Sequence, residues 1–209
     1  QATTTDFYAV NYVPPSAGVS ATAVFQEGVN GYSGTTDTSI ADGAPTTNYG
    51  TQTFLDIDGD TPETTGFIKW DISSIPSNAT IDAAEIVFYN VDPGDDYEFY
   101  ESIRAWTEGG ATWNTYNGTN NWTTAGAKDV GTDIAGTVLG TFSGAGTGFA
   151  TSTLNSSGIA LLQDWVDGTK TNYGFAIQDH LAISGTSPAS SEAATTEQRP
   201  KLVVSYTVP

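Results

Sequence analysis

The sequence predicts an all-β protein, an antiparallel β-sandwich with one short helix and an additional strand at the N-terminus. Short runs of β-branched and aromatic residues alternate with turn sequences at fairly regular spacing, which is typical of sandwiches. A single segment has the apolar spacing of a helix. The 209 residues suffice for one sizeable core, and no apolar run approaches the roughly 20 residues that a membrane-spanning helix needs.

Six runs have the character of strands. They are TFLDI (53–57), GFIKWDI (66–72), AAEIVFYNV (83–91), YEFYESIRAW (97–106), YGFAIQ (173–178) and KLVVSYTV (201–208). Turn sequences such as Asp92-Pro93-Gly94 separate them. Because apolar and polar residues alternate in 81–89 and 201–208, these strands need one buried face, which two packed sheets provide.

Segment 155–168 predicts the helix. Its apolar residues are spaced at i, i+3 and i+7: Ile159, Leu162 and Val166. Ser156 or Ser157 can cap its start, and Gly168 can end it. We expect its apolar side to pack on the sandwich.

A further strand is expected at the N-terminus, where residues 3–13 read TTTDFYAVNYV. Its large apolar residues are Phe7, Tyr8, Val10, Tyr12 and Val13. Pro14 and Pro15 cannot donate ladder hydrogen bonds, so pairing must stop there. We therefore divide the chain into an arm and linker, 1–18, and a sandwich domain, 19–209.

The arm needs a pairing partner, which its own domain or a neighbouring molecule could supply by β-augmentation. Alternation makes it apolar on both faces, which suits a covered groove better than an exposed edge. Donation to the adjacent subunit is a head-to-tail contact that repeats without closing, and such contacts build fibres. One predicted function is thus a structural subunit that polymerises with itself into a filament, with pairing in cis left open.

A series of motifs resembles the DNRLRE, or disaggregatase-related, family. In order they are FQEGVNGYSGTTDTSI (25–40), TTNYG (46–50), GFIKWDIS (66–73), IP (75–76), IDAAEIVFY (81–89), WTEGGATWN (106–114), DWVDGTKTNYGF (164–175) and RPKLVVSY (199–206). The resemblance covers roughly residues 20 to 208. The chain departs from it at Thr64-Thr65-Gly66, where the family often has arginine, and at Trp70, where phenylalanine is usual. An arginine-dependent site is therefore not carried over.

The resemblance implies a jelly-roll sandwich and a secreted, non-catalytic module, and some relatives bind carbohydrate. A carbohydrate-binding module is therefore the alternative function. Trp122 lies with Tyr116 in the polar loop 115–126, where the two rings could form a platform for a sugar. The other interpretation is that this tryptophan packs on its own domain.

The charge restricts the partners. Six basic residues oppose 24 acidic ones, giving a net charge of −18. This field repels nucleic acids, anionic membranes and acidic polysaccharides, and it favours cations, neutral glycans or another protein. We expect no nucleic-acid partner and no membrane insertion.

No catalytic constellation is evident. His180 is the only histidine, and no G-x-S-x-G motif or other nucleophile signature accompanies it. Glu108, in W-x-E before a Gly-Gly turn, is expected to accept hydrogen bonds from that turn. We therefore expect a protein that is not an enzyme.

A calcium site is a separate possibility. Asp56, Asp58 and Asp60 alternate, so on a strand they share one face, and calcium prefers such oxygen ligands. The spacing does not fit an EF-hand, and Asp58-Gly59 could instead be a hairpin turn.

We expect a secreted protein at the cell surface or in the extracellular space. The chain begins at Gln1 and contains no methionine and no cysteine, which fits removal of a signal peptide. Four sequons are candidates for N-glycosylation: Asn78, Asn117, Asn121 and Asn155.

Overall fold

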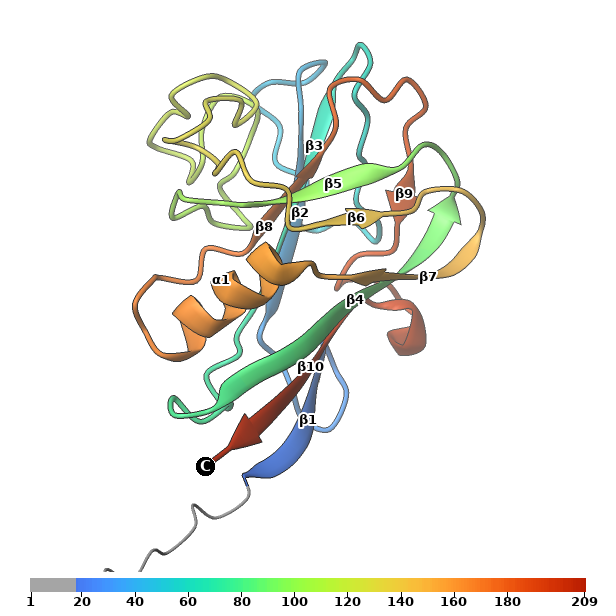
Figure 1. The fold of residues 1–209 in the computed structure, drawn as a ribbon. Coiled ribbons are helices and arrows are strands. Elements are labelled where there is room, and N and C mark those ends of the chain that lie inside the picture. The colour runs from blue at the N-terminus through green and yellow to red at the C-terminus, as the bar shows by residue number, and fades with distance from the viewer. Residues whose placement is uncertain (1–17) are drawn as a thin grey trace, which may run out of the picture.

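A computed structural model describes residues 18–209, and these form two antiparallel sheets that face each other (Figure 1). This confirms the all-β sandwich. The predicted N-terminal strand, with Phe7, Tyr8, Val10, Tyr12 and Val13, lies outside the described residues.

The first sheet, sheet A, has the order β1-β10-β4-β7, and β9 pairs with the end of β4. Its strands are β1 (Val19–Gln26), β4 (Thr80–Asp92), β7 (Gly148–Thr153), β9 (Ser187–Pro188) and β10 (Lys201–Val208). The first and last strands are neighbours, from Val19 opposite Val208 to Gln26 opposite Lys201. Strands distant in the sequence are therefore adjacent in space, as a jelly roll requires.

The second sheet, sheet B, has the order β2-β3-β8-β5-β6. Its strands are β2 (Thr35–Ala41), β3 (Thr64–Trp70), β5 (Tyr97–Glu101), β6 (Gly140–Phe142) and β8 (Phe175–Gln178). The strand expected over 97–106 ends five residues early, at Glu101. Beyond it the chain leaves the strand, and the indole N–H of Trp106 donates to the Tyr173 carbonyl at 2.7 Å.

The principal core lies between the two sheets. Its buried side chains come from both layers and include Ile86, Phe88, Leu202 and Val204 from sheet A, and Ile68, Trp70, Tyr97, Phe99, Phe142 and Phe175 from sheet B. Each such side chain contributes about 1.5–3 kcal/mol when it leaves water. The alternation seen in the sequence supplies these inward residues.

The helix α1 spans Ser156–Val166, close to the prediction, and packs Leu161, Leu162 and Trp165 on the core. Its cap differs from the expected serines. Asn155 is the N-cap, and its side-chain oxygen accepts hydrogen bonds from the backbone N–H groups of the second and third helical residues. Gly168 follows the C-terminal end at φ 77°, a backbone conformation that glycine adopts without strain.

A second hydrophobic cluster lies on the outer face of sheet B. The long loop 102–139, the yellow-green segment beside β5 in Figure 1, covers that face. The cluster consists of Ile40, Phe67, Trp106, Ala111, Trp113, Trp122, Ala127, Ile134 and Ala176. Three of the six basic side chains lie over its rings: Lys69 over Trp106, Arg104 over Tyr116 and Lys128 over Trp113. The loop is therefore packed, although it has few regular elements.

None of the helices in the described part of the chain has the length and apolar character of a membrane span.

Candidate functional site

The structure brings Tyr116 and Trp122 together, with ring centroids 5.7 Å apart, but it does not expose them as a platform. Trp122 is only 4% exposed. One ring face stacks on Phe67 at 5.2 Å, and the indole N–H donates to the Thr112 carbonyl at 2.9 Å. The exposed-platform interpretation is corrected here, because Trp122 belongs to the second hydrophobic cluster.

The three aspartates expected to bind calcium do not form one group of neighbouring carboxylate oxygens among the described residues. Asp56 lines a surface pocket, whereas Asp58 accepts a hydrogen bond from the backbone N–H of Asp60 at 3.0 Å. The bond from Asp58 to the backbone two residues on is an Asx turn, and Asp60 accepts from the N–H of the next residue, Thr61, at 2.7 Å. Calcium binding by this set stays a prediction. If it occurs, a chelator should lower the melting temperature.

A pocket beside the outer edge of β2 has the composition of a sugar site. It encloses about 150 Å³ and is lined by Ser39, Ala41, Tyr49, Gln52, Phe54, Asp56 and Thr64. Phe54 is 38% exposed, so part of its ring faces solvent, and Tyr49 is partly exposed. We call this the Tyr49–Phe54 pocket.

The start of the pocket wall is fixed by the Asn48-Tyr49-Gly50 motif. The Asn48 side-chain amide donates to the carbonyls of Glu108, at 2.5 Å, and Ala111, at 2.8 Å. Its oxygen accepts from the Gly50 N–H at 3.2 Å. A Cβ at Gly50 would lie 2.5 Å from the Glu108 carbonyl oxygen, so only glycine fits this approach. Tyr49 is therefore held against the long loop.

The same pattern of asparagine hydrogen bonds recurs at Asn172-Tyr173-Gly174. There the asparagine side chain donates to the Trp70 carbonyl at 2.9 Å and accepts from the Gly174 N–H at 2.9 Å. Both motifs were visible in the sequence, but only the structure shows that Asn48 anchors its segment to the long loop and Asn172 anchors its segment to β3.

The end of the pocket wall is clamped on both sides of Asp56. The backbone N–H of Leu55 donates to the Pro188 carbonyl at 2.8 Å, and that of Ile57 donates to Thr186 at 3.1 Å. The N–H of Asp56 itself donates to the Ser39 hydroxyl at 2.7 Å. The run 53–57 is thus held by isolated bridges instead of forming the expected strand. Its alternation still holds, with Leu55 and Ile57 buried and Phe54 outside.

The polar chemistry of the pocket centres on Asp56. Partial burial raises the pKa of its carboxyl group, and the negative charges of Asp58 and Asp92 raise it further. Its carboxylate accepts no hydrogen bond that would offset these effects from the described residues. Together with Gln52 it offers hydrogen-bonding groups beside an aromatic ring, the combination that holds a sugar in place.

A group of three acids lies elsewhere along β2. Carboxylate oxygens of Asp37, Glu108 and Glu192 all fall within 4.8 Å of one another, the single such group among residues 18–209. Asp37 is 1% exposed and accepts from the Ser191 N–H at 2.8 Å. Glu108 accepts from the Asp37 N–H at 2.9 Å, so it does accept a backbone hydrogen bond, but from β2 and not from its own turn.

The three acids repel one another. Burial raises the pKa of Asp37 well above its ordinary value, the charge of Glu192 adds to this, and the hydrogen bonds from Ser191 only partly oppose it. Burial likewise raises the pKa of Glu108. Such a group can either retain protons or coordinate a hard cation through its oxygens.

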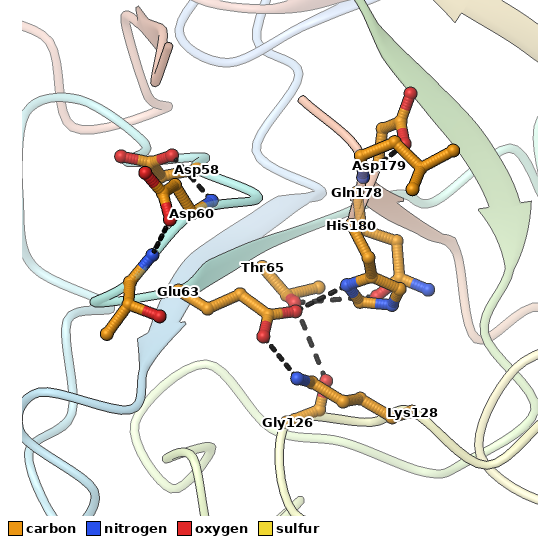
Figure 2. A network of polar contacts seen from close by, with 11 residues as sticks. Asp58, Asp60, Glu63, Thr65, Gly126, Lys128, Gln178, Asp179 and His180 are labelled. Carbon is orange, nitrogen blue, oxygen red and sulfur yellow. Dashed lines mark hydrogen bonds and ion pairs between the residues drawn. The ribbon is translucent and has the colours of Figure 1, made fainter. Parts of the chain in front are cut away.

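His180 belongs to a polar network at the start of β3, centred on Glu63. Figure 2 shows the Glu63 carboxylate between Lys128 and His180, with Asp58 and Asp60 lying apart from this contact. Glu63 is 9% exposed, and the ammonium group of Lys128 compensates this largely buried charge. Because Lys128 comes from the long loop, this network fastens that loop to the end of sheet B.

The four sequon asparagines differ in solvent exposure and in the hydrogen bonds of their side chains. Asn78 and Asn121 are exposed, and Asn117 is half-buried. Asn155 is exposed, but both ends of its side-chain amide are engaged, since its nitrogen donates to the Val138 carbonyl at 2.8 Å while its oxygen caps α1. Whether any of them carries a glycan stays a prediction.

Sequence reasoning missed Tyr49 and Phe54 as site residues. The signal was present, because Phe54 lies on the polar side of an alternating run whose apolar side is Leu55 and Ile57. An aromatic side chain that falls out of phase with the buried face is a candidate for contact with a ligand.

One protein-family model matches part of this chain. Residues 30–131, just under half of it, match the model of carbohydrate-binding module family 96. No curated protein matches. The match supports the coarser expectation, a carbohydrate-binding module, and it does not test the narrower resemblance to the disaggregatase-related family. All seven residues that line the Tyr49–Phe54 pocket lie inside the matched segment.

Proposed function

We propose that this protein is a non-catalytic carbohydrate-binding module that holds its glycan in the Tyr49–Phe54 pocket. One observation carries the proposal: the whole pocket, including a partly exposed phenylalanine, lies within the segment that matches a carbohydrate-binding family. No comparable argument favours Trp122, whose ring is buried.

The chemistry of the pocket suits a sugar ring. Phe54 offers an apolar surface to the C–H groups of the ring, while Gln52 and Asp56 can exchange hydrogen bonds with its hydroxyls. The walls are clamped by backbone hydrogen bonds at Leu55 and Ile57, so little ordering is needed on binding. With a net charge of −18, the protein selects against anionic glycans.

The proposal is tested by calorimetric titration with hexasaccharides of glucose, mannose, xylose, N-acetylglucosamine and glucosamine. We expect saturable binding to at least one of them and no release of reducing sugar over time. Phe54→Ala should abolish that binding. Phe149→Ala is the matched control, because Phe149 is also exposed, at 60%, but lies on sheet A. Equal loss in both variants, or binding to none of the hexamers, would refute the proposal.

The proposed setting is outside the cell, where such modules meet polysaccharides. Fractionation of the native host should recover the protein from the medium or the cell surface. Recovery solely from the cytoplasm would refute this placement.

We also propose that residues 4–13 donate a strand to the next subunit and so build a filament. The supporting observation is that sheet A ends on β1, whose outer edge pairs with no strand among residues 18–209, directly after the predicted arm. An open edge can accept an added strand. Deleting residues 1–13 should leave a folded monomer in sedimentation experiments. Filaments that persist after the deletion would end this proposal.

A further inference from the structure

We propose that the preferred ligand of the Tyr49–Phe54 pocket is a glycan with free amino sugars, whose ammonium group pairs with the carboxylate of Asp56. This inference rests on the proposed carbohydrate-binding function and names the chemical class of its ligand. It follows from the charges around the pocket, from the state of Asp56 and from the neighbouring rings.

The charge around the pocket is negative throughout. None of its seven lining residues is lysine, arginine or histidine, and Asp56 is the one that can carry charge near neutral pH. Asp58 and Asp92 are close enough to act on Asp56 electrostatically. A uronate would bring a further negative charge to this position, and a neutral sugar would bring no charge. An amino sugar would bring a positive charge that compensates the carboxylate.

Asp56 is available for such a pair. Its backbone N–H is bound to Ser39, but the described residues provide its carboxylate with no cationic partner and no hydrogen bond. The raised pKa of this group agrees with an ionised form that lacks compensation. An ammonium group supplies both charge and donors, and a charge-assisted hydrogen bond is stronger than one between neutral groups.

The aromatic residues add a second contribution. Tyr49 and Phe54 line the same pocket as Asp56, and a cation beside an aromatic face is attracted by the ring's quadrupole. The backbone of Asp56 is fixed by the bonds on either side of it. Its carboxylate is therefore presented by a rigid segment, which limits the entropy lost on binding.

The decisive experiment compares two hexamers that differ only in charge, glucosamine and N-acetylglucosamine, at pH 6 in moderate salt. We expect the wild-type protein to bind the glucosamine hexamer about tenfold more tightly, the size of one charge-assisted hydrogen bond. In Asp56→Asn the ratio should fall to about twofold or less. Glu85→Gln removes the same charge from an exposed site on β4 and should keep the wild-type ratio.

Three outcomes overturn the inference. Equal affinity for the two hexamers, with binding still lost in Phe54→Ala, would remove the amino-sugar preference and leave the carbohydrate-binding function standing. An equal fall of the ratio in Glu85→Gln and Asp56→Asn would show adsorption to the acidic surface instead of a pocket. Failure of every glycan in the panel to bind would refute the underlying function itself.

Discussion

Two pairs of aromatic residues in polar loops differ in their exposure to solvent. Tyr116 and Trp122 lie in the long loop over sheet B, and Tyr49 and Phe54 lie in the connection between β2 and β3. Trp122 is 4% exposed, whereas Phe54 is 38% exposed. Local composition points to the first pair as a binding surface, yet the second pair lines the pocket.

The difference arises from what each loop covers. The long loop lies on the outer face of sheet B, where Phe67 points outward and needs an apolar neighbour, and Trp122 stacks on it. The connection that carries Phe54 is held by backbone hydrogen bonds from Leu55 and Ile57, whose side chains are buried. Phe54 points to the opposite side, where no sheet covers its ring. Exposure of an aromatic residue is therefore decided by the available sheet surface and not by the polarity of its neighbours in sequence.

The largest expected effect is on stability at the buried pair. Trp122→Ala removes a stacked ring and a bonded indole N–H, and we expect it to lower the free energy of unfolding by about 3–5 kcal/mol. Phe54→Ala should lower it by less than about 1 kcal/mol, because its ring is partly in solvent already. Urea denaturation measures both. Similar losses in the two variants would contradict the distinction.

A smaller effect is expected from a buried carboxylate within the long loop. Asp133 is fully buried and accepts hydrogen bonds from the N–H groups of Thr123 and Thr124 and from Arg104. Burial acts to raise its pKa, but these donors together outweigh it and lower the pKa. Asp133→Asn should cost about 1–3 kcal/mol at neutral pH, since it weakens the bonds to charged groups.

The pH dependence gives the sign of this contribution. A depressed pKa in the folded state means that Asp133 stabilises the protein above its unfolded pKa and loses that contribution as pH falls through the folded value. The free energy lost in the Asp133→Asn variant should therefore shrink below about pH 4. A difference between wild type and variant that is constant down to acid pH would contradict the assignment.

For Asp37, on β2, the pH dependence of stability has the opposite sign. Because the folded-state pKa of Asp37 is raised, the native state holds its proton longer, and stability falls as pH rises from about 4 through the folded pKa. Asp37→Asn should flatten that decline, by an amount measured in unfolding curves from pH 4 to 8 with chelator present. An unchanged slope would show that Asp37 does not titrate in this range.

A small effect is expected at the helix cap, far from both aromatic pairs. Asn155→Ala removes the N-cap of α1 and should cost about 1 kcal/mol. Thermal unfolding monitored by circular dichroism measures it. A loss of unfolding free energy as large as that of Trp122→Ala would mean that the helix cap stabilises the protein as much as the buried ring does.

Sequence reasoning gave the sandwich, because alternation in 81–89 and in 201–208 reports the buried face of a strand directly, and it gave α1 to within a residue or two. It assigned the N-cap to Ser156 or Ser157 and not to Asn155, since three neighbouring polar residues can all serve as caps and only packing selects one. It also ran the strand at 97–106 too far, because the tertiary bond from Trp106 to Tyr173 is not encoded locally.

The candidate site was less accessible from the sequence. Asp56, Asp58 and Asp60 alternate, but Asp58 and Asp60 are used in an Asx turn, a local hydrogen-bonding choice that competes with a strand. Asp37, Glu108 and Glu192 are far apart in the chain, so no spacing rule could bring them together. The resemblance to the disaggregatase-related family offered a carbohydrate-binding module as the alternative function, whereas the pocket could be found only from the fold.

The central claim is that a glycan binds at the Tyr49–Phe54 pocket and not over the long loop. Amide chemical-shift mapping during titration with the glucosamine and glucose hexamers tests it most directly. We expect the saturable shifts to centre on Tyr49, Gln52, Phe54 and Asp56, with Tyr116 and Trp122 unchanged. Shifts centred on Tyr116 and Trp122, with those at Phe54 unchanged, would contradict the account.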